Sequence, residues 1–223
     1  MSISLGGLMF HPVEAATTTI GTTKGGWVYA GQRPCYEAKT PAFYTMAAPL
    51  TTREVLEVMG GPDGNADEGA METLTSLDLT ELAQTLMDDE AFSKAVEALP
   101  GTWEVRALTH AEWLAAREQK KIELDMGLTE RLADAPSSNH RGAMMDGRPR
   151  PNELLGPASS QMAAIAVHPR NPEVTAMASV PHDRPLPNVV ARLALTPIRM
   201  DEAIRVPNDT DVWRNVRTEL LWT

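Results

Sequence analysis

Three short stretches of the chain share one order of apolar and polar residues, and each predicts the start of a helix. They span residues 50–55, 77–82 and 108–113, with Thr51, Asp78 and Thr109 as the expected caps. In each stretch a short polar side chain is followed three residues later by a glutamate, and an apolar pair flanks the cap. Such a capping box pairs two backbone amides that the first helical turn leaves free, and the apolar pair sets the entry angle.

The spacing of apolar residues beyond these caps predicts the lengths of the helices. We expect helices over residues 52–59, 78–87 and 110–124, the first of them closing at Gly60. A further short helix should begin after Asp89 and end at Pro100, because proline and glycine interrupt a helical pattern. Terminal residues 210–222 predict an amphipathic helix.

Five apolar or β-branched runs predict short strands, over residues 17–22, 42–46, 103–106, 163–168 and 189–195. Between residues 134 and 160 the chain turns to proline, glycine, serine, asparagine and arginine without any period. Long irregular segments of this kind are uncommon in a compact domain and often carry function.

Charge is distributed unevenly along the 223 residues, whose formal net charge is −10. Residues 61–100 contain ten carboxylates and a single lysine, whereas the chain from residue 131 onward is close to neutral. Such a chain repels nucleic acid and acidic membranes. The acidic block predicts a solvated helical face, with a docking surface for a basic partner as the alternative.

Cys35 is the single cysteine, so the chain has no intrachain disulfide and no cysteine-rich metal site. The first residues have no lysine or arginine ahead of their apolar part, which argues against a signal peptide. No apolar run approaches the roughly eighteen residues needed to span a bilayer. We therefore expect a soluble, cytoplasmic protein.

Residues 106–113 read Arg-Ala-Leu-Thr-His-Ala-Glu-Trp and lead into an alanine-rich helix. This segment resembles the Arg-Leu-Pro-Thr-Glu-Ala-Glu-Trp hallmark of the formylglycine-generating enzyme (sulfatase-modifying factor) family. Weaker matches follow the family's order at residues 19–21, 40–44, 50–51, 151–156 and 188–192. The resemblance implies an α+β, C-type-lectin-like fold over residues 17–197, rich in loops, with short strands and three to four helices. Residues 1–16 would then be an N-terminal segment and residues 198–223 an amphipathic extension.

The chain departs from this family where the family's chemistry is carried. Those enzymes oxidise a substrate cysteine with a cysteine pair in the C-terminal half, whose thiolates hold copper. This chain has no cysteine after Cys35, and the family's Gly-Asn-x-x-Glu-Trp segment is missing after Gly156. Monovalent copper requires soft sulfur ligands. We therefore expect no formylglycine-generating activity, no catalytic residue of that type and no cofactor.

The histidines allow a second chemistry. His168, His182 and Asp183 together form the two-histidine, one-carboxylate set of a facial iron site, but their spacing matches no known metal motif. Histidine and aspartate beside proline more often form turns.

The function expected from the sequence is that of a non-catalytic binding or scaffold module. Its recognition surface would be the loops at residues 136–184, with His168, His182 and Arg184 as ligand-binding residues for a protein or a small molecule. One alternative is a metal-dependent oxidoreductase that uses histidine and aspartate ligands. The other is a subunit of a larger complex, docked through the acidic face at residues 61–100 or through the C-terminal helix.

Overall fold

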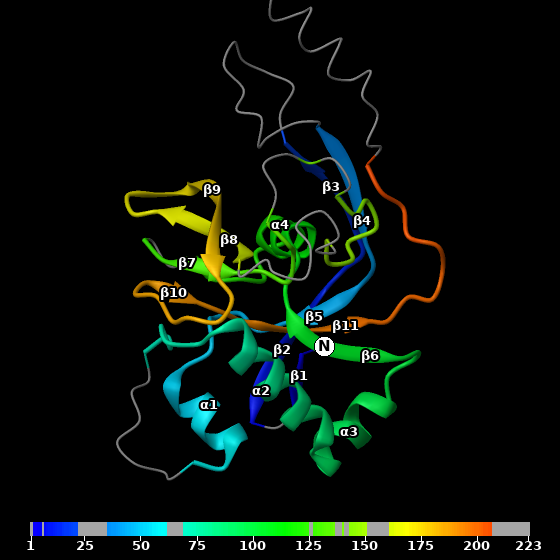
Figure 1. Ribbon diagram of the computed structural model, residues 1–223. Helices are drawn as coiled ribbons and strands as arrows, with labels where there is room; N and C mark the ends of the chain where they lie inside the picture. The colour runs from blue at the N-terminus through cyan, green and yellow to red at the C-terminus, as the bar shows by residue number, and fades with distance from the viewer. Residues whose placement is uncertain are drawn as a thin grey trace, which may run out of the picture.

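The centre of the structure is a five-stranded antiparallel sheet that divides the molecule into two halves (Figure 1). The computed structural model describes residues 2–5, 7–21, 35–61, 69–124, 127–136, 140, 143–150 and 161–206. The strand order is β1-β2-β5-β11-β6, so strands from early and late in the chain lie side by side. These strands are β1 (Ile3–Leu5), β2 (Leu8–Val13), β5 (Phe43–Thr45), β6 (Trp103–Ala107) and β11 (Leu193–Pro197).

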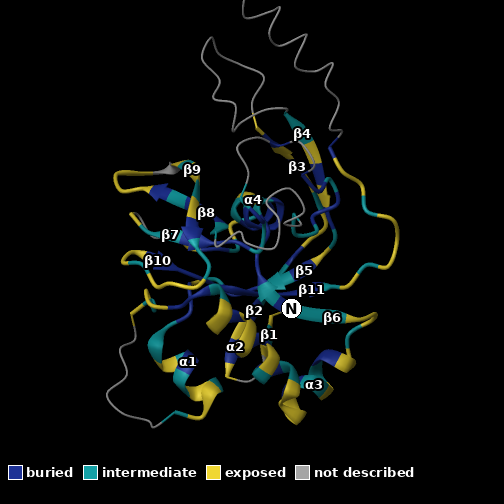
Figure 2. Cartoon of the chain, in the orientation of Figure 1, coloured by how far each residue is buried: buried dark blue, intermediate teal, exposed yellow. Residues whose placement is uncertain are grey.

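Three helices cover the lower face of this sheet in the view of Figure 1: α1 (Thr52–Met59), α2 (Ser76–Asp88) and α3 (Glu90–Glu97). Leu82 and Leu86 of α2 and Phe92 of α3 are buried against Phe10 of β2 in one hydrophobic cluster. Each such side chain contributes about 1.5–3 kcal/mol when it is fully removed from water. The outer faces of these helices are largely exposed (Figure 2), as the acidic composition of this stretch predicts.

The upper half packs around α4 (His110–Glu118). On one side of α4 lies a four-stranded sheet of order β10-β7-β8-β9, and on the other side lies the two-stranded pair β3-β4. These strands are β3 (Ala16–Ile20), β4 (Tyr36–Thr40), β7 (Thr129–Arg131), β8 (Gln161–His168), β9 (Asn171–Pro181) and β10 (Val189–Val190). Trp113, Ala115 and Ala116 of α4 are completely buried. The two alanines have no bulk beyond Cβ, so the helix approaches its neighbours closely.

The apolar run at residues 189–195 is two strands rather than the single predicted one. Val189 and Val190 pair in parallel with β7 of the upper sheet, whereas residues 193–197 pair with β6 of the central sheet. Ala191 and Arg192 lie at the crossing, where Ala191 accepts a hydrogen bond from the Leu50 amide. Apart from Arg192, the run is apolar because both of its halves are buried.

Two predicted helix ends require correction. The second helix begins at Ser76, and Thr75 is its cap: the Thr75 hydroxyl accepts the Asp78 amide at 3.1 Å, and the Asp78 carboxylate accepts the Thr75 amide at 2.7 Å. Asp78 is therefore the third residue of a capping box and not the cap. The fourth helix ends at Glu118 rather than near residue 124, because Lys120 adopts a left-handed backbone (φ 55°) and the Lys121 amide turns back to the Ala116 carbonyl. Glycine is the usual residue at such a stop.

Other predictions about the helices are confirmed. Residues 52–59 and 90–97 are helical, and Thr51 and Thr109 both form complete capping boxes. Gly60 is left-handed (φ 69°) and closes the first helix as its position suggests.

The strand predictions missed β1, β2, β4, β7 and β9. Residues 1–16, expected to precede the domain, contribute β1 and β2 to the central sheet. Of the residues expected to form irregular loops at 136–184, those from 161 to 181 form the β8–β9 hairpin, which has a register shift between Val167 and His168. The helix expected at residues 210–222 lies outside the described residues, as do residues 62–68 and 151–160.

The described residues thus form an α+β structure with four helices. Among them, no helix is both long enough and apolar enough to cross a membrane.

Candidate functional site

The joint between β6 and α4 is a closed network of hydrogen bonds. Arg106 donates from its two terminal nitrogens to the two carboxylate oxygens of Glu112, at 2.7 and 2.9 Å. Glu112, which is 1% exposed, also accepts the amide of Thr109 at 2.8 Å. Burial by itself lowers the pKa of Arg106, but the carboxylates of Glu112 and Glu104 outweigh it and hold this pKa above its ordinary value. The network fixes the direction in which α4 leaves the sheet.

A second buried ion pair holds the two sheets together. Arg192 donates to both carboxylate oxygens of Glu130 on β7, at 2.6 and 3.0 Å, and Glu130 also accepts the indole N–H of Trp113 at 2.9 Å. The remaining guanidinium hydrogens of Arg192 reach the carbonyls of Ala47 and Glu123. A buried charge pair is tolerated when every donor and acceptor is used in this way. We assign this pair a structural role.

Asp134 connects the start of α4 to the loop that follows it. Its carboxylate accepts the amide of His110 at 2.6 Å and the amide of Arg150 at 2.7 Å. The His110 amide is one of the first-turn amides that a capping box leaves unpaired. Burial raises the pKa of Asp134, and the two backbone hydrogen bonds act in the opposite direction.

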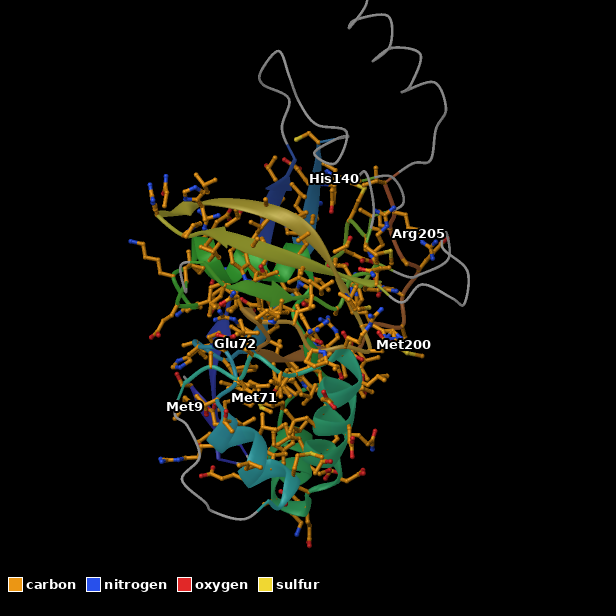
Figure 3. All side chains as sticks on the ribbon, turned by 60° about the vertical axis from the view of Figure 1, so that its left-hand side comes forward. Met9, Met71, Glu72, His140, Met200 and Arg205 are labelled. Atoms are coloured by element: carbon orange, nitrogen blue, oxygen red, sulfur yellow. The ribbon has the colours of Figure 1, made fainter. Side chains whose placement is uncertain are left out.

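A small cavity, called the polar cavity because titratable side chains line it, adjoins Asp134. It is lined by Tyr36, Thr109, His110, Ala111, Asp134, Ala135, His140, Ala143, Met144, Arg148, Arg150, Ala163 and Met177. Burial and the neighbouring His140 lower the pKa of His110 to about 4, and burial together with Asp134 raises the pKa of Tyr36. His110 and Tyr36 are therefore neutral at pH 7. His140 lies in the upper half near β3 and β4 (Figure 3). Its ring packs edge-on against that of Tyr36, with 5.4 Å between the two ring centroids.

The volume of this polar cavity limits what it holds. It encloses about 50 Å³, and one water needs about 10–15 Å³ on the same measure. The cavity therefore accommodates a few waters or one small polar group, but not a substrate of ordinary size.

A larger groove lies between α2 and β6, with a volume of about 510 Å³. It is lined by Ser76, Leu79, Thr80, Ala83, Gln84 and Met87 of α2, by β6 from Trp103 to Ala107, and by Leu132, Ala133 and Met162. The α2 residues recur every three to four positions and so form one stripe along the helix. Ligand sites usually span about 300–1,000 Å³. By volume the α2–β6 groove is the stronger candidate for a binding site.

The structure separates the three residues that the sequence nominates for ligand binding. His168 ends β8 at the turn of the β8–β9 hairpin, whereas His182 and Arg184 follow the far end of β9, where Pro181 pairs with Gln161. The seven residue steps from Gln161 to His168 place these two ends about 23 Å apart at a rise of about 3.3 Å per step.

Only His182 and Arg184 share one neighbourhood. Arg131 donates to the backbone carbonyls of Pro181 and Arg184, and the His182 carbonyl accepts the Ser76 amide. The Nδ1 atom of His182 is buried without a hydrogen-bond partner among the described residues. A ligand-binding role for His182 and Arg184 stays a prediction.

The distance between His168 and His182 also argues against the iron site that was considered as an alternative. His168 lies a full strand length from His182 and Asp183, whereas metal–nitrogen bonds are about 2 Å long. These three residues therefore do not surround one ion. No cluster of three or more histidine, cysteine, aspartate or glutamate side chains suited to a metal occurs within the described part of the chain.

Comparison with known proteins gives a likeness at the level of the fold. No family model matches the sequence, and no curated protein sequence matches it significantly. Among solved structures, PvdO from Pseudomonas aeruginosa superposes with a TM-score of 0.64 at 13% identity, over 88% of this chain and 98% of PvdO. Treponema denticola variable protein 1 gives 0.58 at 11% identity, over 88% of this chain and 99% of that protein. Identities this low show a shared fold only.

The α2–β6 groove was missed because its two walls lie about twenty residues apart in the chain. One signal for it exists: Thr80, Gln84 and their neighbours form a stripe of small and polar residues between the apolar and acidic faces of α2. Nothing near Asp134 in the sequence marks its role. Arg192 was indicated only through the family resemblance at residues 188–192.

Proposed function

We propose that this chain is a binding module of the formylglycine-generating-enzyme type, with a C-type-lectin-like fold and no cysteine-oxidase chemistry, and that its ligand site is the α2–β6 groove. Support for the family relationship comes from the hallmark residues. Arg106, Glu112 and Trp113 form the buried joint around which α4 is placed. Because these residues place α4, substitutions in this segment would disturb the fold.

Two facts support binding rather than cysteine oxidation. The copper site of that family requires a thiolate pair, and Cys35, which precedes β4, is the only cysteine in the chain. The residues present therefore do not fit the metal. The polar cavity, where titratable groups gather, is too small for a peptide substrate.

The observation that carries the proposal is the groove itself. It is about ten times larger than the polar cavity, and Leu79, Ala83 and Val105 give it an apolar lining. A large, mostly apolar concavity with a few polar groups is the usual form of a ligand site.

The surface originally expected at residues 136–184 stands as a second candidate. Val174 and Met177 on β9 are 50% and 41% exposed, which is high for apolar side chains on a regular strand. Such residues favour a partner rather than a metal ion, so the oxidoreductase alternative gains no support from this region.

Methyl NMR of the full chain labelled at its methionines tests the groove directly. Met87 and Met162 line the groove, whereas Met9 and Met200 are exposed elsewhere (Figure 3) and serve as internal controls. Three eight-residue peptides are titrated, alternating valine with lysine, with serine or with glutamate. We expect at least one peptide to shift the Met87 and Met162 signals and to leave Met9 and Met200 unchanged. If no peptide shifts them, or all four methionines shift together, the groove is not a binding site.

The absence of oxidase chemistry has its own assay. The purified chain, supplied with Cu(I) and oxygen, should form no aldehyde from a cysteine-bearing peptide. Conversion of that cysteine to an aldehyde would overturn this part of the proposal.

A further inference from the structure

The α2–β6 groove follows the open edge of a sheet. β6 is the last strand of the five-stranded sheet and, among the described residues, it pairs only with β11. The Leu193 carbonyl accepts the Met46 amide, so the backbone groups of Leu193 point toward β5 and those of Ala194 point toward β6. Because the direction alternates along an antiparallel ladder, the backbone groups of Trp103 and Val105 point away from β11. They face the side on which the groove lies.

The walls of the groove suit the side chains of an added strand. Val105 belongs to the cluster shared with α2, and Leu79, Ala83 and Met87 continue that apolar surface past the edge of the sheet. Glu104 and Arg106 point to the opposite face of β6, toward Glu112 at the start of α4. A strand lying beside β6 would therefore have one apolar face and one polar face.

We propose that the groove takes an extended segment of a partner protein, which pairs with β6 as an additional strand and alternates apolar with basic residues. This inference rests on the proposed function and specifies its ligand. Strand addition to an exposed edge derives affinity from main-chain hydrogen bonds and specificity from pockets for alternate side chains.

The charges near the α2–β6 groove favour a basic partner. Between residues 69 and 100 there are seven carboxylates and one lysine. Glu81 and Asp88 are exposed on α2, and Asp88 accepts a hydrogen bond at 2.8 Å from Gln84, which lines the groove. Among the described residues, Arg106 is the single cation that lines the groove, and it is already paired with Glu112 and Glu104. A basic segment gains attraction here, and an acidic one is repelled.

The same charges disfavour the other occupants. A second copy of the chain would bring another −10 to an acidic face. Residues 207–223 of this chain contain three carboxylates and two arginines, which gives no positive charge to complement the helices.

The test uses the full chain and the lysine–valine peptide, with binding followed by fluorescence anisotropy of a labelled copy. Two N-methylated versions are compared, one methylated at every valine nitrogen and one at every lysine nitrogen. Because the N–H groups of a strand alternate between its two edges, only one of these versions should lose affinity, by about tenfold or more. Equal affinities for the two versions would overturn strand addition and would leave groove binding intact.

The charge requirement has a separate readout. The lysine–valine peptide should bind at least about tenfold more tightly than the glutamate–valine peptide, and its affinity should fall as salt rises from about 0.05 to about 0.5 M. Equal binding of the two peptides would overturn the basic partner while the proposed function stands.

Matched variants locate the site. Gln84→Arg, on the groove stripe, should weaken binding of the lysine–valine peptide about tenfold. Ala91→Arg, on the exposed surface of α3 away from the groove, makes the same charge change and should alter binding less than about twofold. Equal weakening by both variants would contradict binding in the groove.

Two further outcomes would assign the edge of β6 to another occupant. If the chain forms a dimer and the dimer does not bind the peptide, the occupant is a second copy of the chain. If the peptide binds only after residues 207–223 are removed, the occupant is the end of the same chain.

Discussion

The polar cavity at the start of α4 and the α2–β6 groove represent two different uses of a concave surface. In the cavity, the carboxylate of Asp134 accepts two backbone amides, and little space remains beside it. The groove is about ten times larger, and β6 has no second strand beside it among the described residues. Titratable residues around a cavity are therefore a poor guide to function when, like Asp134, they are hydrogen-bonded to the chain's own backbone. Unfilled apolar space beside unpaired backbone is the better guide.

The largest expected effect on stability comes from the buried ion pair of Glu130 and Arg192. Glu130→Ala leaves Arg192 buried without its carboxylate, and we expect a loss of about 3–5 kcal/mol in the free energy of unfolding. Denaturant unfolding measures it, and Glu90→Ala, which breaks the exposed pair with Lys94, is the matched control. If Glu130→Ala does not fold, replacing both Glu130 and Arg192 by methionine should recover folding. A change below about 1 kcal/mol would mean that the pair is not structurally important.

A smaller loss is expected at the cavity itself. Asp134→Ala leaves the amides of His110 and Arg150 unpaired, which should lower the free energy of unfolding by about 2–3 kcal/mol. Asp134→Asn keeps one acceptor oxygen for one of these amides and turns its NH2 group toward the other, so a large part of the loss should remain. A loss below about 1 kcal/mol in Asp134→Ala would show that these two hydrogen bonds do not stabilise the start of α4.

Acid should lower the free energy of unfolding through protonation of His110, which lines the polar cavity. The pKa of His110 is about 4 in the folded chain and 6.5 when unperturbed, so between these values the unfolded chain binds more protons. Stability is therefore complete above pH 6.5 and falls as the pH drops toward 4, by about 1–2 kcal/mol for a partly exposed ring. The raised pKa of Asp134 acts in the opposite direction. Urea unfolding of the natural chain and of His110→Gln between pH 4 and 7 separates the two, and parallel pH profiles would exclude His110 as the cause.

The smallest stability effect is expected in the groove. Thr80 and Gln84 are exposed, and arginine is a good helix former, so Thr80→Arg and Gln84→Arg should change the free energy of unfolding by less than about 0.5 kcal/mol. Thermal or denaturant unfolding of the two variants provides the check. A loss above about 1 kcal/mol would mean that these positions stabilise the fold, which would remove the contrast between groove and cavity.

Much of the helical framework was predictable because its signals are local. The capping boxes at Thr51 and Thr109 and the cap at Asp89 act within three or four residues. The same reasoning placed the start of α2 at the wrong polar residue, because Thr75 and Asp78 both have suitable side chains. Which of them caps the helix depends partly on the Ser76 amide, which binds the carbonyl of His182 from another part of the chain.

The strands were harder to predict, because burial rather than local pattern decides them. β9 contains prolines and polar residues and looks irregular, yet residues 175–181 pair with β8 in an unbroken antiparallel register. β4, with the sequence Tyr-Glu-Ala-Lys-Thr, has a half-buried alternation that is clear only once β3 lies beside it.

The sequence alone determined where most helices begin, that α2 and α3 are acidic on the outside, and that no thiolate pair is available for copper. These properties depend on residue identity or on contacts within one helical turn. Tertiary structure alone decided that Glu130 pairs with Arg192 across 62 residues and that the carboxylate of Asp134 accepts two backbone amides. It also decided that β6, in the part of the chain that the structure describes, forms the edge of its sheet beside α2. These outcomes depend on which distant segments pack together, and the pairing of distant segments is set by the burial of whole surfaces.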